Sequence, residues 1–267
     1  MYIYIFFYLY LTIYIKKETM FSFDEGRKVA VIKGGARDGQ YLYMRESKMG
    51  LNEVKMGKDE KLQPVPDRDI VEKIYISAPS GAGKSTFTAN WIREFRKMFR
   101  KDEIYLFSSI ASDRVLDKQD PTRIILDQDL LADPIDIEEL DQSLVIFDDV
   151  DTIRDKEMRV YLEGLRDHIL EVGRHFDVRL LITSHLLSNY SSTRRVLNEA
   201  TCVVVFPKSG SGTYHIKNFL KIYCGLDSKQ IKKFLNLPSR WVAIYRSYPQ
   251  YVVHEKGAYC PQSDMYE

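Results

Sequence analysis

The stretch Lys73-Ile-Tyr-Ile-Ser-Ala-Pro-Ser-Gly-Ala-Gly-Lys-Ser-Thr86 decides how the rest of the chain is read. It begins with a short β-type run, Ile74–Ser77, which passes into a loop of small residues, Ala78–Gly83. A helical pattern, Phe87–Lys101, follows the loop closely. A strand, a small-residue loop and a helix in this order form the Walker A arrangement, which binds the phosphates of a nucleotide.

The residue types in the loop fit this chemistry. Gly81 and Gly83 allow a positive φ and a close approach of the backbone to phosphate. Successive backbone N–H groups and the positive end of the helix then attract the phosphate oxygens. Lys84 is predicted to contact the β- and γ-phosphates, and Ser85 to offer its hydroxyl to Mg²⁺. Ala78 replaces the usual first glycine, which is tolerable if its φ is negative. The expected ATP-binding residues are Ala78, Pro79, Ser80, Gly81, Ala82, Gly83, Lys84, Ser85 and Thr86.

Composition limits the class of protein. The chain has 267 residues, enough for one large α/β domain with appendages. Its 39 basic and 38 acidic residues give a net charge of +1, which excludes a strongly basic protein. A local basic surface, or a ring of subunits, could still bind nucleic acid. The three cysteines are too widely spaced for a metal motif or a disulfide framework, which suits a reducing compartment.

The sequence before the Walker A motif divides into two parts. Residues 1–20 form an apolar, tyrosine-rich extension with three interpretations: a disordered segment, a segment left untranslated because Met20 is the natural start, or a membrane anchor. The third is disfavoured because a span needs roughly 20 apolar residues. In residues 21–69 we expect a β-hairpin, Lys28–Lys33 with Gln40–Met44, and then a polar linker.

Residues 70–267 are predicted to form the ATPase core, ending in a pair of strands. Apolar β-type runs alternate in this part with amphipathic helical patterns, which favours a mostly parallel sheet flanked by helices. We therefore expect an α/β fold, a RecA-like P-loop domain with a small N-terminal β-hairpin. The basic side of the helix Phe87–Lys101 is interpreted as a solvated face rather than as a contact for DNA.

A second functional signal lies about 60 residues after the Walker A loop. The unbroken apolar run Leu144–Phe147 is typical of a strand buried on both faces of a parallel sheet, and Asp148 and Asp149 follow it. Ligands bind at the carboxyl ends of such strands. Asp148 is predicted to hold Mg²⁺ through water, and Asp149 to orient and deprotonate the attacking water.

A third signal is the strand Val178–Ile182, which ends in Thr183-Ser184-His185. A polar residue there can sense the γ-phosphate, and we expect His185, or else Ser184, to do so. The alternative for His185 is the cap of a following helix.

Arg174 lies a few residues before the strand Val178–Ile182. Together with this arginine, the three motifs resemble those of the FtsK–HerA superfamily of ring-forming DNA-pumping ATPases. His185 stands where that superfamily has glutamine. A narrower resemblance, to the A32-like genome-packaging ATPases of large DNA viruses and virophages, spans about residues 71–259. It is carried further by Leu197-Asn-Glu-Ala200, Val205-Phe-Pro-Lys-Ser209, Tyr223-Cys-Gly-Leu226 and Leu237-Pro-Ser-Arg-Trp241.

The resemblance implies a virion ATPase that uses ATP and Mg²⁺ to move double-stranded DNA into a preformed capsid. Its implied partners are DNA, further copies of the chain in a homo-oligomeric ring, and a capsid portal or vertex component. Its implied location is the virion or a virus factory in the host cytoplasm. Arg174 could then act as an arginine finger on the ATP of a neighbouring subunit, with Arg194 and Arg195 as rivals. The alternative for Arg174 is a helix C-terminal arginine that interacts with the helix dipole.

Other functions on the same core stay open from the sequence. They are another P-loop motor such as a helicase or secretion ATPase, a nucleotide-binding switch, and a small-molecule kinase. The paired aspartates argue against a switch that hydrolyses little. A kinase needs an arginine-rich lid, which residues 190–195 could imitate only weakly.

Overall fold

The computed structural model of the chain describes residues 19–46, 51–188, 193–209 and 212–261. Of the predicted N-terminal extension, residues 1–20, residues 1–18 lie outside the described residues, and residues 19 and 20 belong to the first strand, β1 (Thr19–Ser22). Among the helices that are described, none is long and apolar enough to cross a membrane.

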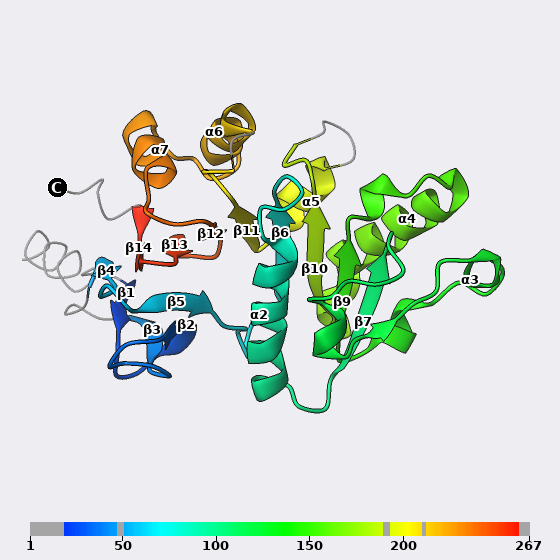
Figure 1. Ribbon diagram of the computed structural model, residues 1–267, viewed down its shortest axis with the longest axis horizontal. Coiled ribbons are helices and arrows are strands. Elements are labelled where there is room, and N and C mark those ends of the chain that lie inside the picture. Colours follow the sequence, from blue (N-terminus) through cyan, green and yellow to red (C-terminus); the bar gives the residue numbers. More distant parts are fainter. Residues whose placement is uncertain (1–18, 47–50, 189–192, 210–211, 262–267) are drawn as a thin grey trace, which may run out of the picture.

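A ten-stranded sheet forms the centre of the molecule, in the order β4-β14-β13-β12-β11-β6-β10-β9-β7-β8 (Figure 1). From β11 to β8 all neighbouring strands are parallel, and from β11 to β4 they are antiparallel. The expected α/β fold with a mostly parallel core is confirmed. The strands are β4 (Glu53–Lys55), β6 (Lys73–Ser77), β7 (Glu103–Ser108), β8 (Thr122–Arg123), β9 (Ser143–Asp148), β10 (Arg179–Ser184), β11 (Cys202–Val205), β12 (Val242–Tyr245), β13 (Tyr251–His254) and β14 (Gly257–Tyr259).

Helices cover both faces of this sheet. One face packs against α4, α5, α6 and α7, and the other against α2 and the small N-terminal sheet. Alternate residues of a strand therefore enter different hydrophobic clusters: Tyr75 lies in the first, and Ile74 and Ile76 lie in the second. Burial on both faces explains why the central strands are uninterrupted apolar runs. The helices are α2 (Lys84–Met98), α3 (Gln128–Ala132), α4 (Lys156–Val172), α5 (Arg194–Glu199), α6 (Thr213–Ile222) and α7 (Ser228–Leu235), with one-turn helices η1 (Asp117–Gln119), η2 (Ile137–Leu140), η3 (Val150–Thr152) and η4 (Gly173–His175).

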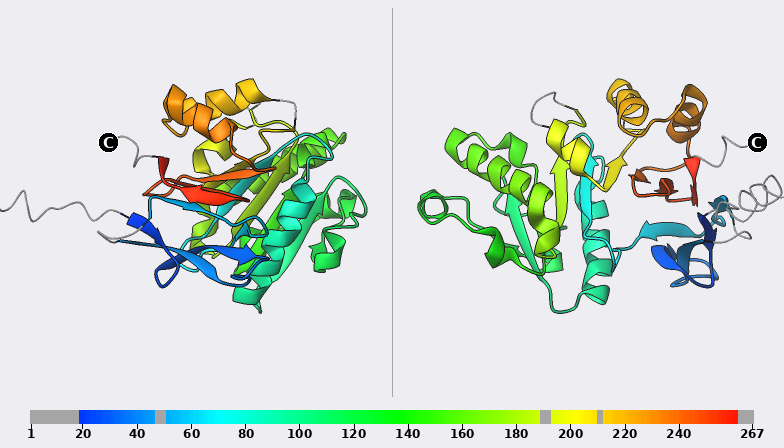
Figure 2. Two further views of the ribbon diagram at one scale, coloured as in Figure 1. Left: turned by 60° about the vertical axis from the view of Figure 1, so that its left-hand side comes forward. Right: turned by 180° about the vertical axis from the view of Figure 1, so that it is seen from behind.

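The N-terminal residues form a second, four-stranded sheet in the order β1-β3-β2-β5 (Figure 2). Its strands are β1 (Thr19–Ser22), β2 (Arg27–Lys33), β3 (Tyr41–Glu46) and β5 (Lys61–Pro64). The expected hairpin is present, since β2 pairs with β3 antiparallel. Gly34 and Gly35, with φ of 79° and 65°, reverse the chain between them.

The prediction of a polar linker after the hairpin is wrong in one respect. Within it, β4 pairs with β14 of the large sheet and β5 pairs with β2 of the small sheet. Val54 and Leu62 are buried aliphatic side chains that help to hold these two strands in place. Strands of three and four residues have too few apolar positions to be recognised without their partners, and β14 lies about 200 residues further along the chain.

Candidate active site

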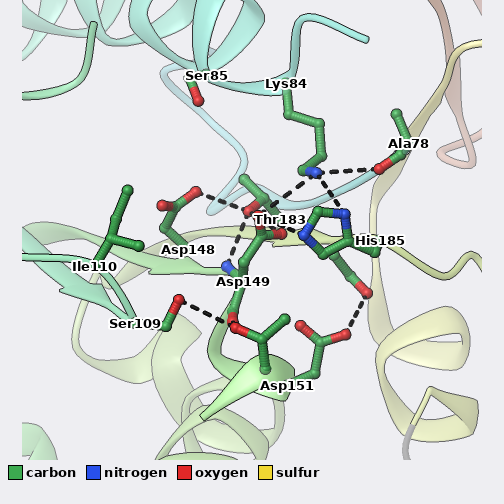
Figure 3. Close-up of polar contacts among 12 residues, drawn as sticks. Ala78, Lys84, Ser85, Ser109, Ile110, Asp148, Asp149, Asp151, Thr183 and His185 are labelled. Atoms are coloured by element: carbon green, nitrogen blue, oxygen red, sulfur yellow. Dashed lines mark hydrogen bonds and ion pairs between the residues drawn. The ribbon is translucent and has the colours of Figure 1, made fainter. Parts of the chain in front are cut away.

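The predicted site residues meet at one edge of the large sheet. In the parallel register Ser184 of β10 lies beside Ser77 of β6, and Thr183 lies beside Asp148 of β9. The carboxyl ends of β6, β9 and β10 therefore carry the Walker A loop, the paired aspartates and His185 to the same place (Figure 3).

The loop between β6 and α2 has the backbone that its glycines predict. Gly81 and Gly83 have φ of 75° and 112°, where any other residue would be strained. Ala78 has no positive φ, is 4% exposed, and its N–H donates to the carbonyl of Ser184 at 3.1 Å. Its methyl group therefore packs in the core without disturbing the loop.

Lys84 lies at the centre of the polar contacts. Its Nζ donates to the carbonyl oxygen of Ala78 at 3.0 Å and lies 3.3 Å from Nδ1 of His185. It also forms an ion pair with Oδ2 of Asp149 at 3.5 Å. Only 7% of the residue is exposed, so Lys84 is a buried cation. It is held by the loops that follow β9 and β10, and a phosphate bound to the Walker A loop would connect the two.

Thr183 joins the two aspartates. Its hydroxyl lies 2.8 Å from Oδ1 of Asp148 and 3.1 Å from Oδ1 of Asp149, so its single proton is shared between two acceptors. It accepts the backbone N–H of Asp149 at 3.0 Å, which fixes that residue at a left-handed φ of 49°. The backbone conformation of Asp149 thus depends on the neighbouring strand.

Asp148 is the buried acid of the pair, at 5% exposure. Burial raises the pKa of its carboxyl, and the charge of Asp149 raises this pKa further. Hydrogen bonds from Thr183 and from the Ser108 hydroxyl, 3.0 Å from Oδ2, oppose the rise by stabilising the charged form. A nearby cation would have the same effect on this carboxyl.

His185 lies between the lysine and the second aspartate. Its Nε2 is 3.1 Å from Oδ2 of Asp149, while its Nδ1 faces Lys84. In the described residues no helix begins at His185, since α5 starts at Arg194, so the helix-cap interpretation is wrong. Ser184, the alternative sensor, instead donates to Oδ2 of Asp151 at 3.0 Å.

The side chains that could hold Mg²⁺ all present oxygen atoms. The Ser85 hydroxyl donates to Oδ2 of Asp113 at 3.2 Å, and Asp148 carries a carboxylate at the same edge of the sheet. Across the described part of the chain, no cluster of three His, Cys, Asp or Glu side chains could bind a metal alone. This donor set fits Mg²⁺, which usually takes one or two protein oxygens together with phosphates and water.

Sequence reasoning missed three side chains of this site: Thr183, Ser108 and Asp113. Thr183 is the last residue but one of β10 and Ser108 is the last residue of β7; both strands flank β9, and both residues lie at the level of Asp148 in the registers. A polar residue at the end of a strand that neighbours the acidic strand is therefore the signal that could have found them. Asp113 lies in a loop and carries no such signal.

The arginines proposed as fingers lie elsewhere. Arg174 is exposed in η4, before the start of β10, and so lies at the edge of the sheet opposite to the Walker A loop. Its side chain makes no ion pair or hydrogen bond with any of the residues that the structure describes. Arg195 instead pairs with Asp167 at 3.4 Å and Glu171 at 3.1 Å on α4.

A cleft of about 240 Å³ adjoins the Walker A loop on the α2 side. Gly83 and Thr86 line it from the loop and from α2, and Phe206, Arg240 and Trp241 line it from the C-terminal part of the chain. A Cβ atom on Gly83 would lie 3.6 Å from the guanidinium of Arg240. The cleft thus combines an apolar wall, a cation and direct access to the phosphate loop.

Comparisons with known proteins add the following. No family model matches the sequence. The chain is 38% identical to the "Uncharacterized protein V3" of Sputnik virophage over 237 residues, which are 88% of this chain and 95% of that protein. The genome packaging NTPase B204 from Sulfolobus turreted icosahedral virus 2, solved with AMPPCP, is 12% identical with a TM-score of 0.46, over 68% of this chain and 96% of that one. The conjugation coupling protein TcpA of pCW3, solved with ATPgS, is 12% identical with a TM-score of 0.42, over 90% of this chain and 79% of that one.

Proposed function

The chain belongs to the same family as protein V3 of Sputnik virophage, and from the site above and the resemblance of its motifs to A32-like packaging ATPases we propose that it is an ATP-hydrolysing motor that translocates double-stranded DNA. Its task in this proposal is to package a viral genome into a capsid. The observation that carries the proposal is the Walker A lysine in contact with both Asp149 and His185. DNA as the transported molecule and a capsid as its destination are inferred from the resemblance to A32-like packaging ATPases.

The Walker A loop binds the triphosphate through its backbone N–H groups and Lys84. Phe206 and Arg240 in the adjoining cleft receive the nucleoside part. Ser85 and Asp148 would hold Mg²⁺, which would supply positive charge to the phosphates. The loop conformation, the cleft and the oxygen atoms at the sheet edge support these assignments.

Asp149 is the proposed general base for the attacking water. Its Oδ2 is in contact with two side chains, Nζ of Lys84 at 3.5 Å and Nε2 of His185 at 3.1 Å. When Lys84 turns to a bound phosphate, Asp149 loses one of these partners and becomes available to accept a proton from water. His185 is then the group that registers whether the γ-phosphate is present, because it touches both Lys84 and Asp149.

Arg174 is proposed as the finger that completes the site of a neighbouring copy in a ring. It is exposed and lacks a partner among the described residues, whereas Arg195 is occupied on α4. An arginine finger typically contributes about 10³–10⁵ in rate, so a lone subunit is expected to be nearly inactive. A capsid portal or vertex component is the proposed docking partner, in the virion or in a virus factory.

The first test measures ATP hydrolysis by the full chain across protein concentration, with and without double-stranded DNA, and with Lys84→Ala as the blank. The proposal expects a rate per subunit that rises with concentration and with DNA. Hydrolysis that is linear in protein and indifferent to DNA would contradict it and favour a switch or a kinase.

The second test mixes Lys84→Ala with Arg174→Ala. Each variant alone should be inactive, but a mixed ring contains intact sites in which a lysine-deficient subunit supplies its arginine to the neighbour. Recovered activity in the mixture is the expected result. No recovery, with both variants folded and assembled, would exclude Arg174 as a finger.

A further inference from the structure

The charge of the chain is distributed unevenly. Residues 201–250 contain eight lysines and arginines and one aspartate, a net charge of +7 in a chain whose total is +1. The single acid, Asp227, accepts the N–H of Gln230 as the cap of α7. The basic residues of this part are Lys208, Lys217, Lys221, Lys229, Lys232, Lys233, Arg240 and Arg246.

Four of these lysines form one exposed surface, here called the α6–α7 surface: Lys217 and Lys221 on α6, and Lys229 and Lys232 on α7. Lys217 and Lys221 are one helical turn apart, as are Lys229 and Lys232, on the sides away from the buried Phe219 and Phe234. None of the four has a carboxylate within ion-pair distance among the described residues, whereas the neighbouring Lys233 pairs with Glu53. The two helices lie side by side at one end of the molecule in every view (Figures 1 and 2).

This surface is connected to the catalytic edge of the sheet. α6 follows β11, whose carboxyl end lies beside that of β6 because the two strands are parallel. Phe206 and Arg240, which precede and follow the two helices in the chain, both approach Gly83 of the Walker A loop. His215 of α6 contacts the segment that begins at His185, since its Nδ1 lies 2.7 Å from the hydroxyl of Ser188.

We propose that the α6–α7 surface binds the phosphate backbone of double-stranded DNA, and that the Ser188–His215 contact transmits the state of the ATP site to it. The proposal rests on the motor function above and names the surface on which that motor holds its track. Exposed lysines that form no ion pair among the described residues match a polyanion, because each one that neutralises a phosphate releases a counterion. A protein partner fits less well, since lysine is depleted in protein–protein interfaces.

The chain itself offers a rival occupant. Residues 127–141 contain seven acidic residues and no basic one, and α3 in this segment lies far from α6 and α7 (Figure 1). A second copy could therefore place its acidic segment on the α6–α7 surface. The experiment must separate DNA binding from self-association.

The test compares two quadruple variants of the full chain. The first changes Lys217, Lys221, Lys229 and Lys232 to Gln. The matched control changes four exposed basic residues on and after α2 to Gln: Arg93, Arg100, Lys101 and Lys118. Binding of a fluorescent 30-base-pair duplex is measured by anisotropy between 50 and 300 mM salt, and assembly is followed by sedimentation velocity.

The first variant is expected to bind the duplex at least about tenfold more weakly, and to reduce the slope of log K against log salt by about 3 to 4. The control should match the wild type, and the hydrolysis of ATP without DNA should be the same in all three proteins. His215→Ala should bind DNA normally and lose the stimulation of hydrolysis by DNA.

Three results would overturn the inference. Unchanged duplex binding by the first variant, while the wild type binds DNA, contradicts the surface but leaves the motor function standing. Loss of assembly with unchanged duplex affinity of the subunit identifies the surface as an interface between copies. A wild-type chain that neither binds nor responds to DNA refutes the motor proposal and this inference together.

Discussion

Replacing Thr183 with valine isolates the contact that joins the two aspartates. Valine has nearly the same shape as threonine but lacks the hydroxyl, and the residue is only 1% exposed. Asp148 then loses its 2.8 Å donor, and the N–H of Asp149 loses its 3.0 Å acceptor.

The cost can be estimated from the two broken contacts. A hydrogen bond to a charged group contributes about 1.5–3 kcal/mol, and a buried donor left without a partner costs about 1–3 kcal/mol. Because Asp148 keeps its bond from Ser108, we expect a total of about 2–4 kcal/mol. For a domain of this size that lowers Tm by roughly 5–15 °C.

The same change should shift the pH dependence of hydrolysis. The bond from Thr183 lowers the pKa of Asp148 against the upward effect of burial, so its loss lets this pKa rise further. Protonated Asp148 cannot hold a cation, so activity is lost as the pH falls through that pKa. The acid limb of kcat/KM is therefore expected to move to higher pH in Thr183→Val, with kcat about 10–100-fold lower if 1.4–2.8 kcal/mol of positioning is lost.

The assay is scanning calorimetry together with a pH–rate profile for wild type, Thr183→Val and Thr183→Ser. Serine keeps the hydroxyl and should restore the position of the acid limb, even if it packs less well. A valine variant with an unchanged Tm and an unchanged acid limb would refute the role given to Thr183.

Two further predictions concern other parts of the chain. Glu72 is 4% exposed, and burial raises the pKa of its carboxyl to about 8. Folding therefore takes up a proton between the unfolded pKa of 4.5 and about 8, and stability should fall as the pH rises through this window. Glu72→Gln should make the free energy of unfolding fall less steeply with pH in this window, by up to about 1.4 kcal/mol per pH unit, and should make the protein more stable above pH 8. The measurement is urea unfolding at several pH values. The same dependence on pH in wild type and variant would contradict the prediction. Arg240→Ala should weaken ATPγS binding about tenfold in calorimetric titration, while Lys58→Ala, outside the cleft, should not; equal affinities would show that the nucleotide does not use this cleft.

The elements that the sequence predicts correctly are those whose signal is local. The Walker A loop needs glycines at two fixed positions, and both have the positive φ that explains them. The central strands are recognisable because burial on both faces requires an unbroken apolar run such as Leu144–Phe147. Parallel pairing then brings their carboxyl ends together, so Lys84, Asp149 and His185 could be expected in one place.

What the sequence does not show depends on distant partners. Val54 reads as an isolated apolar residue until β14 pairs with β4. In the sequence Thr183 belongs to the polar end of a strand, and only the register shows that it lies beside Asp148. The lysines of α6 and α7 read as two solvated helix faces, and only the fold joins them into one surface near the catalytic edge.

The position of Arg174 has a consequence for the mechanism. In a parallel sheet all strands begin at one edge and end at the other, so a residue before β10 and a loop after β6 lie at opposite edges. Arg174 therefore cannot reach the phosphate loop of its own chain without unfolding the strand between them. If it acts on ATP, it does so in another copy that presents its opposite edge, which is a head-to-tail contact. Head-to-tail contacts close into rings when the rotation permits. A trans-acting Arg174 and a ring are thus a single hypothesis, and the recovery of activity in mixed Lys84→Ala and Arg174→Ala rings tests both.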